Sequence, residues 1–206
     1  MKLFVTGIST DVGKTVASAI ITEALEADYW KPLQSGDLHH TDSDKVRALI
    51  SNNKSVIHPE AYCFQMPASP HASAAAENIK IDLSKISEPK TKNKLVIEGA
   101  GGLLVPLDNE ATISDLIKPD YKVIVVSRHY LGSINHTLLT IESLKLRKKN
   151  IAGILFSGDE HPTTESIIAK MSGCKILGRI NQEPYFDQNI IREYADEFRD
   201  TLKELE

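Results

Sequence analysis

One stretch near the N-terminus decides the fold of this chain: Val5-Thr6-Gly7-Ile8-Ser9-Thr10-Asp11-Val12-Gly13-Lys14-Thr15-Val16. It joins a short apolar strand, Leu3-Phe4-Val5, to a helical run, Lys14 to Ala27, through a loop that ends Gly-Lys-Thr. The backbone N–H groups of such a loop and of the first helical turn are preorganised donors for phosphate oxygens. The lysine reaches the outer phosphates and the threonine hydroxyl holds magnesium. The stretch therefore predicts a triphosphate-binding loop.

The loop departs from the strict phosphate-binding pattern by one residue. That pattern has four residues between its glycines, whereas five separate Gly7 from Gly13, and Ile8 stands where the first glycine would be. A structural glycine turn is the alternative interpretation. Because the strand before the loop and the helix after it supply the required context, we favour a variant P-loop.

Five nearly continuous apolar segments predict strands that are buried on both faces, as in a parallel sheet covered by helices. They are Lys2–Thr6, Lys94–Glu98, Lys122–Ser127, Ile151–Phe156 and Lys175–Ile180. Helical patterns alternate with them at Lys14–Ala27, Thr112–Lys118, Ile134–Lys149, Thr163–Ser172 and Asn189–Glu206. This alternation predicts the α/β class, as a three-layer P-loop NTPase-like domain with a mostly parallel sheet flanked by helices. The polar segment Leu33–Asn93, with one helix expected at Asp42–Asn52, reads as an insertion on the substrate side.

Length and composition favour one globular domain over residues 1–206. The 24 basic and 28 acidic residues give a net charge of −4, so nothing suggests a nucleic-acid or membrane partner. The only cysteines, Cys63 and Cys174, lack metal or redox spacing, and we expect buried thiols in a reducing compartment. No signal core or apolar run of about 20 residues is present, so we expect a cytoplasmic protein.

Glu98 is a carboxylate that the predicted parallel sheet places near the glycine loop. It ends the apolar run Leu95-Val96-Ile97 and is followed by Gly99-Ala100-Gly101-Gly102, which should let the backbone turn freely. Open α/β sheets bind ligands at this end of their strands, and an acidic residue there can hold magnesium opposite Thr15. The alternative is a carboxylate that caps nearby N–H groups. Asp42 and Asp44 begin the next predicted helix, where capping is the default explanation.

Two further segments are weaker signals on their own. Trp30-Lys31-Pro32-Leu33-Gln34-Ser35-Gly36 places a lysine and a hydroxyl near the end of a short strand expected at Tyr29–Lys31. Leu131-Gly132-Ser133-Ile134-Asn135-His136 begins a helix whose free N–H groups could receive an anion such as a carboxylate, although simple capping by Ser133 would also explain it.

Together these motifs, with Ser69-Pro70-His71, occur in the order that is typical of dethiobiotin synthetases, and the chain resembles that family from Lys2 to about Ile180. The resemblance implies an ATP-dependent cyclo-ligase of biotin biosynthesis that converts 7,8-diaminononanoate, CO2 and ATP into dethiobiotin, ADP and phosphate with Mg2+. It also implies a homodimer that binds its substrate across the subunit interface. In the mechanism that the resemblance implies, a carbamate on one amine attacks the γ-phosphate, and the second amine closes the ring of the resulting carbamic–phosphoric anhydride.

The resemblance also implies roles for single residues. Lys14 and Lys31 are the expected catalytic residues, and Thr15, Asp44 and Glu98 are the expected metal ligands. The expected nucleotide-binding residues are Asp11, Val12, Gly13, Lys14, Thr15, Val16, Glu98, Gly99, Ala100 and Gly101. The expected substrate-binding residues are Thr10, Lys31 and Ser35, with Gly132, Ser133, Ile134 and Asn135 from the partner subunit.

The chain departs from the family where the base is read. Ser157-Gly158 stands in place of the usual Asn-Asp pair, and Arg179-Ile180-Asn181-Gln182 in place of a loop that often holds Pro-Trp. Phosphate binding is thus better supported than the choice of base. The rival interpretations are another small ATP-dependent ligase and a ParA/MinD-like ATPase switch. Such switches generally carry a second lysine early in the P-loop, where this chain has Ser9.

Overall fold

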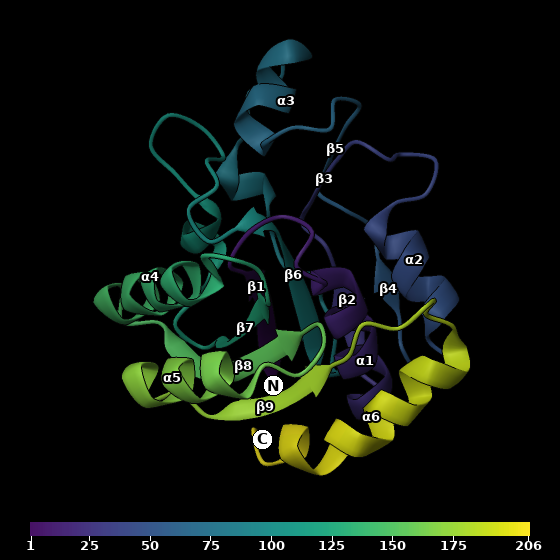
Figure 1. The fold of residues 1–206 in the computed structure, drawn as a ribbon. Coiled ribbons are helices and arrows are strands. Elements are labelled where there is room, and N and C mark those ends of the chain that lie inside the picture. The colour runs from purple at the N-terminus through teal and green to yellow at the C-terminus, as the bar shows by residue number, and fades with distance from the viewer.

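Seven parallel strands form the central sheet of the computed structural model, which describes residues 1–206 (Figure 1). Their order is β4-β2-β6-β1-β7-β8-β9. The strands are β1 (Lys2–Gly7), β2 (Asp28–Trp30), β4 (Ile57–His58), β6 (Leu95–Gly102), β7 (Lys122–Arg128), β8 (Asn150–Ser157) and β9 (Ile176–Ile180). All five predicted apolar strands are present, and the predicted parallel α/β sheet is confirmed.

Helices cover both faces of the sheet (Figure 1). On one face lie α1 (Lys14–Leu25), α2 (Asp42–Leu49) and α6 (Gln188–Lys203), and on the other lie α4 (Ser133–Leu146) and α5 (Pro162–Ser172). Residues of β1 alternate between the two layers, since Leu3 and Val5 pack in the core under α1 whereas Phe4 packs in the core under α4. The strands β1, β6, β7 and β8 contribute residues to both cores, which explains their continuous apolar sequences, whereas β9 contributes Leu177 and Ile180 to the core under α1 only and exposes Ile176.

The chain order of the strands places the site. After β1 the chain builds β2, β4 and β6 on one side of it and then β7, β8 and β9 on the other. The connections that leave the carboxyl ends of β1 and its two neighbours therefore diverge, and this divergence is where open parallel sheets bind ligands. Near these carboxyl ends lie the glycine loop, Glu98 and Arg128.

Several local predictions are corrected by the structure. The glycines after Glu98 do not form a free turn, because β6 continues to Gly102 and pairs with Gly7 across a register shift, with Gly101 at φ +68. The predicted helix Thr112–Lys118 is only a 3-10 helix, Ile113–Leu116. Pro119 explains why no α-helix continues, since a proline disfavours helical backbone in the residue before it.

The segment expected to hold one helix is more elaborate than its sequence predicts. Besides α2 it contains β3 (Leu33–Ser35) paired in parallel with β5 (Tyr62–Phe64), the helix α3 (Pro70–Ala76) and a short 3-10 helix, Leu83–Lys85. Both cysteines are free, but they are not buried as expected, since Cys63 is exposed and Cys174 is half-buried. None of the helices combines the length and the apolar character that crossing a membrane requires.

Candidate active site

The glycine loop between β1 and α1 contains two residues with left-handed backbone and one position that only glycine can occupy. Gly13 lies at φ 91 and Asp11 at φ 55, both in the left-handed region that favours glycine. At Gly7 a Cβ would lie 2.6 Å from Val12 Cγ2, so only glycine fits there. Gly13 also begins α1 without any side-chain cap, which leaves the N–H groups of the first turn free to bind an anion.

Lys14 is held inside the loop. Its Nζ donates to the Ser9 carbonyl oxygen at 3.0 Å, and the residue is 7% exposed. Burial lowers the pKa of Lys14 to about 8, and the nearby Glu98 carboxylate offsets this effect only in part. The positive charge of Lys14 is therefore only partly balanced by nearby negative charge in the free protein, and a triphosphate would supply the rest.

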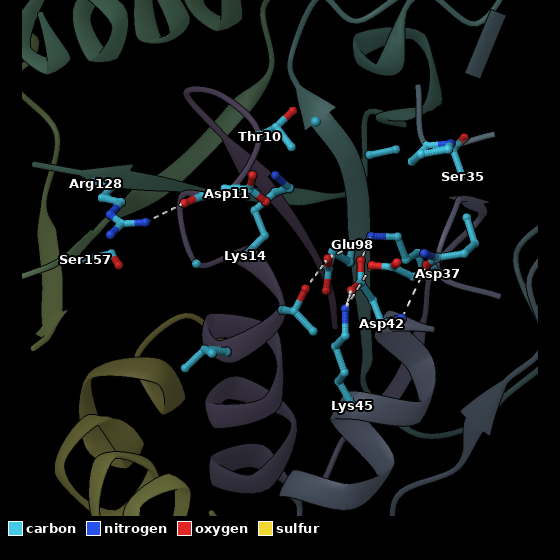
Figure 2. Close-up of a pocket in the computed structure, with 18 of the residues that line it drawn as sticks. Thr10, Asp11, Lys14, Ser35, Asp37, Asp42, Lys45, Glu98, Arg128 and Ser157 are labelled. Carbon is cyan, nitrogen blue, oxygen red and sulfur yellow. Dashed lines mark hydrogen bonds and ion pairs between the residues drawn. The ribbon is translucent and has the colours of Figure 1, made fainter. Parts of the chain in front are cut away.

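A buried network joins the loop to the strands beside it (Figure 2). Glu98 Oε1 accepts from Thr15 Oγ1 at 3.0 Å and from Lys31 Nζ at 3.0 Å, and Glu98 Oε2 accepts from the Tyr29 hydroxyl at 2.9 Å. Lys31 Nζ also donates to Asp42 Oδ2 at 2.5 Å. One ammonium group thus lies between two carboxylates.

The pKa shifts follow from this arrangement. Burial alone would lower the pKa of Lys31, but the carboxylates of Glu98 and Asp42 outweigh it and hold the pKa above its ordinary value. Burial likewise opposes the charged form of Asp42, yet Lys31 keeps the pKa of that carboxyl below its usual range. Burial raises the pKa of Tyr29 well above its ordinary value, so its hydroxyl stays protonated. The site thus holds a charged Lys31 paired with the ionised carboxylate of Asp42.

Asp44, expected as a metal ligand, does not face this network. Its Oδ2 accepts from the Thr41 backbone N–H at 3.1 Å and its Oδ1 from Arg47 at 2.6 Å, and its side chain is 42% exposed. Thr41 caps α2 and Asp44 is the third helical residue, so its carboxylate folds back onto the cap. Asp42, at the first helical position, points out of the helix end and meets Lys31 instead. The structure therefore brings Asp42, and not Asp44, to Lys31 and Glu98.

A cavity of about 790 Å³ extends over these groups, a size suited to small-molecule ligands. Most of the expected site residues line it, namely Thr10, Asp11, Gly13, Lys14, Thr15, Val16, Lys31, Ser35, Glu98, Ala100 and Gly101. The hydroxyl oxygen of Ser35 is buried at this cavity without a hydrogen-bond partner from the protein.

Other expected residues lie outside the cavity. The Val12 side chain is buried in the core, a Cβ at Gly99 would meet Phe4 and Ile113, and neither residue lines the cavity. The segment Gly132, Ser133, Ile134 and Asn135 begins α4 away from this chain's own cavity. Leu131 beside it is fully exposed, and Gly132 caps α4 without a side-chain hydrogen bond.

The structure adds residues that the sequence-based prediction missed. Arg128 ends β7, lines the cavity and donates through Nη1 to the Asp11 carbonyl oxygen at 3.0 Å (Figure 2). The rule that indicated Glu98, a polar side chain at the carboxyl end of a strand, could also have indicated Arg128. Asp42 and Tyr29 gave no comparable signal, because their contacts with Lys31 and Glu98 join separate segments.

At the far end of the cavity lie the residues that replace the family's usual base-reading pair. Ser157 and Gly158 line it together with Asn181 and Gln182. The Ser157 hydroxyl lies against the glycine loop, since a Cβ at Gly13 would be 2.9 Å from Ser157 Oγ. It therefore packs beside the phosphate loop.

Comparison of the whole structure with solved ones identifies the fold. The MinD cell division ATPase of Pyrococcus furiosus aligns with a TM-score of 0.60 and 14% identity, covering 99% of this chain and 98% of that one. The septum site-determining protein MinD of Pyrococcus horikoshii, in complex with Mg-ADP, aligns with a TM-score of 0.59 and 15% identity, covering 100% and 96%. These similarities show a P-loop NTPase fold.

Comparison of the sequence is more specific. A family model described as an AAA domain matches residues 1–189. The ATP-dependent dethiobiotin synthetase BioD of Christiangramia forsetii is 56% identical over 202 residues, which cover 98% of each chain. That of Cytophaga hutchinsonii is 49% identical over 196 residues, covering 94% of this chain and 95% of the relative. With a P-loop fold and near full-length similarity of this degree, the chain belongs to the ATP-dependent dethiobiotin synthetase family.

Proposed function

We propose that this protein carboxylates 7,8-diaminononanoate with CO2 and closes the ureido ring at the expense of ATP, giving dethiobiotin, ADP and phosphate. The observation that carries this proposal is the single cavity shared by two buried lysines, Lys14 and Lys31, with the Glu98 carboxylate beside Lys31. A triphosphate and a carbamate are both anions, and the two lysines supply the positive charge needed to bring them together.

ATP is assigned to the glycine-loop side of the cavity. The uncapped first turn of α1 and the left-handed loop backbone offer N–H groups to the phosphates. Lys14 would exchange its bond to the Ser9 carbonyl for the outer phosphates, where its full charge is compensated. Arg128 adds a second cation and steadies the loop through the Asp11 carbonyl.

Magnesium is the metal that the donor set fits. Lys31 Nζ lies between the carboxylates of Glu98 and Asp42, and the Thr15 hydroxyl donates to the same Glu98 oxygen, so a cation already lies beside these donors in the free protein. Hard oxygen donors of this kind suit Mg2+, which completes its shell with waters and substrate phosphates. Thr15, Glu98 and Asp42, in place of Asp44, would hold it. When bound, it neutralises charge that develops on the transferring phosphoryl group.

Lys31 is assigned to the carbamate. CO2 adds to one amine of the substrate with loss of a proton, and Lys31 would bind the carbamate oxygens and orient them toward the γ-phosphate. Attack of a carbamate oxygen on the γ-phosphorus breaks the bond to ADP and forms the mixed anhydride. The second amine then attacks the carbonyl carbon, loses a proton and releases phosphate. Thr10 and the unpaired Ser35 hydroxyl line the same cavity and would bind the substrate.

A second subunit would complete the substrate site. Gly132 to Asn135 begin α4 outside this chain's own cavity and without a side-chain cap, although the Ser133 N–H already donates to the Tyr130 carbonyl oxygen at 2.9 Å. The adjacent Leu131 side chain is fully exposed, as suits a residue that a partner covers. We therefore assign this segment to the substrate carboxylate bound in the neighbouring subunit of a homodimer.

The direct test incubates the purified protein with 7,8-diaminononanoate, bicarbonate, Mg2+ and ATP and looks for dethiobiotin by mass. Lys14→Ala should fold and give no product, since a loop lysine contributes little to core packing. Lys31→Ala should retain ATP binding and lose most product. ATP turnover stimulated by DNA or lipid, with no effect of the diamine, would instead indicate a switch ATPase.

A further inference from the structure

We propose that Tyr29 is a positioning residue that fixes the rotation of the Glu98 carboxylate, so that one oxygen of Glu98 always faces the cavity. This inference rests on the proposed function, because its consequence is the affinity of the magnesium site. Tyr29 does not line the cavity, so it would act through Glu98 alone.

Tyr29 can hold the Glu98 carboxylate in place because packing fixes the position of its own ring. It lies in β2 opposite Val96 of β6, two residues before Glu98 along that strand. It is fully buried, and its ring packs in the core between the sheet and the helices α1 and α2. Motion of the ring would require the surrounding close-packed side chains to move as well.

The two carboxylate oxygens of Glu98 have different hydrogen-bond partners. Oε2 accepts from the Tyr29 hydroxyl at 2.9 Å, and this is its only hydrogen bond. Oε1 accepts both from Thr15 and from Lys31, the groups that belong to the proposed metal and carbamate sites. The last torsion of a glutamate side chain is broad, so sterics alone do not choose between the two oxygens.

Loss of the hydroxyl would remove this distinction. The buried Oε2 would be left without a donor, and the carboxylate would turn to share Lys31 or Thr15 between both oxygens. The proposed metal site would then have a ligand that must be reoriented before each binding event. Such supporting hydrogen bonds to metal ligands change affinity by about 10- to 100-fold when removed.

The test compares Tyr29→Phe with a matched control, Tyr121→Phe. Tyr121 is also buried, and its hydroxyl donates to Glu88 Oε2 at 2.6 Å, next to the start of β7 and therefore at the opposite end of the sheet from the cavity. Each variant keeps its ring and loses one hydrogen bond to a carboxylate. Binding of Mn2+ to each protein with a non-hydrolysable ATP analogue is measured by electron paramagnetic resonance, and thermal unfolding is followed in parallel.

We expect Tyr29→Phe to weaken Mn2+ binding at least tenfold and to raise the half-saturating Mg2+ concentration for turnover to match, while kcat at saturating Mg2+ falls by less than threefold. Tyr121→Phe should leave both values within twofold of wild type, even though it lowers the unfolding temperature. Unchanged Mn2+ binding in Tyr29→Phe, in a protein that loses it on Glu98→Gln, would overturn the role of Tyr29 alone. Unchanged binding in Glu98→Gln as well would overturn the proposed metal site.

Discussion

Replacement of Lys31 by methionine tests the network at the centre of the site. The substitution keeps an unbranched apolar side chain that is one atom shorter, and it removes the charge between Glu98 and Asp42, whose side chains are 1% and 19% exposed. Removing one partner of a buried ion pair costs about 3 to 5 kcal/mol, because the other charge stays buried and uncompensated. For a domain of this size each kcal/mol lowers the unfolding temperature by about 2 to 4 °C, so we expect a loss of roughly 6 to 20 °C.

A matched control and a metal titration separate this explanation from general damage. Lys45 pairs with the other oxygen of Asp42 at 3.0 Å but is 34% exposed, so Lys45→Met should cost at most about 1 kcal/mol. Mg2+ should raise the unfolding temperature of Lys31→Met by more than that of wild type, because a divalent cation can take the place of the missing ammonium. Thermal unfolding with EDTA and with Mg2+ measures both effects. A Lys31→Met protein within 2 °C of wild type, or one that Mg2+ stabilises no more than wild type, would refute the reasoning.

Asp42→Asn should raise the Mg2+ concentration for half-maximal turnover at least tenfold, whereas Asp44→Asn should leave it within twofold; the reverse order would restore Asp44 as the ligand. Burial lowers the pKa of Lys14 to about 8, and a triphosphate needs the charged form of this lysine. The affinity for a non-hydrolysable ATP analogue should therefore be constant below pH 8 and fall by up to tenfold per pH unit above it. A flat profile to pH 10 would contradict this. Ser157-Gly158 stands in place of a paired amide and carboxylate, so GTP and CTP should each give a kcat/KM within about tenfold of that for ATP, which corresponds to a base-dependent difference of roughly 1.4 kcal/mol. A preference for ATP beyond a hundredfold would show another adenine site.

The sequence by itself determined the features that depend on neighbours along the chain. The apolar runs of β1, β6, β7 and β8 are buried on both faces, so each can be recognised as a strand without knowledge of its neighbours in the sheet. The glycine loop is equally local, since its two glycines, its lysine and its threonine lie within nine residues of one another. The loop and the parallel sheet together are sufficient to predict a site at the carboxyl ends of the strands.

Tertiary structure decided which side chains meet at that place. Asp42 and Asp44 are both acidic residues of the same helical turn, and only the cap at Thr41 and the packing of α2 direct one inward to Lys31 and the other outward. The glycines after Glu98 permit a turn, yet pairing with Gly7 keeps them in the sheet. Sequence patterns report the period of burial along one segment, whereas contacts between segments depend on strand register and helix rotation, which only the packed chain sets.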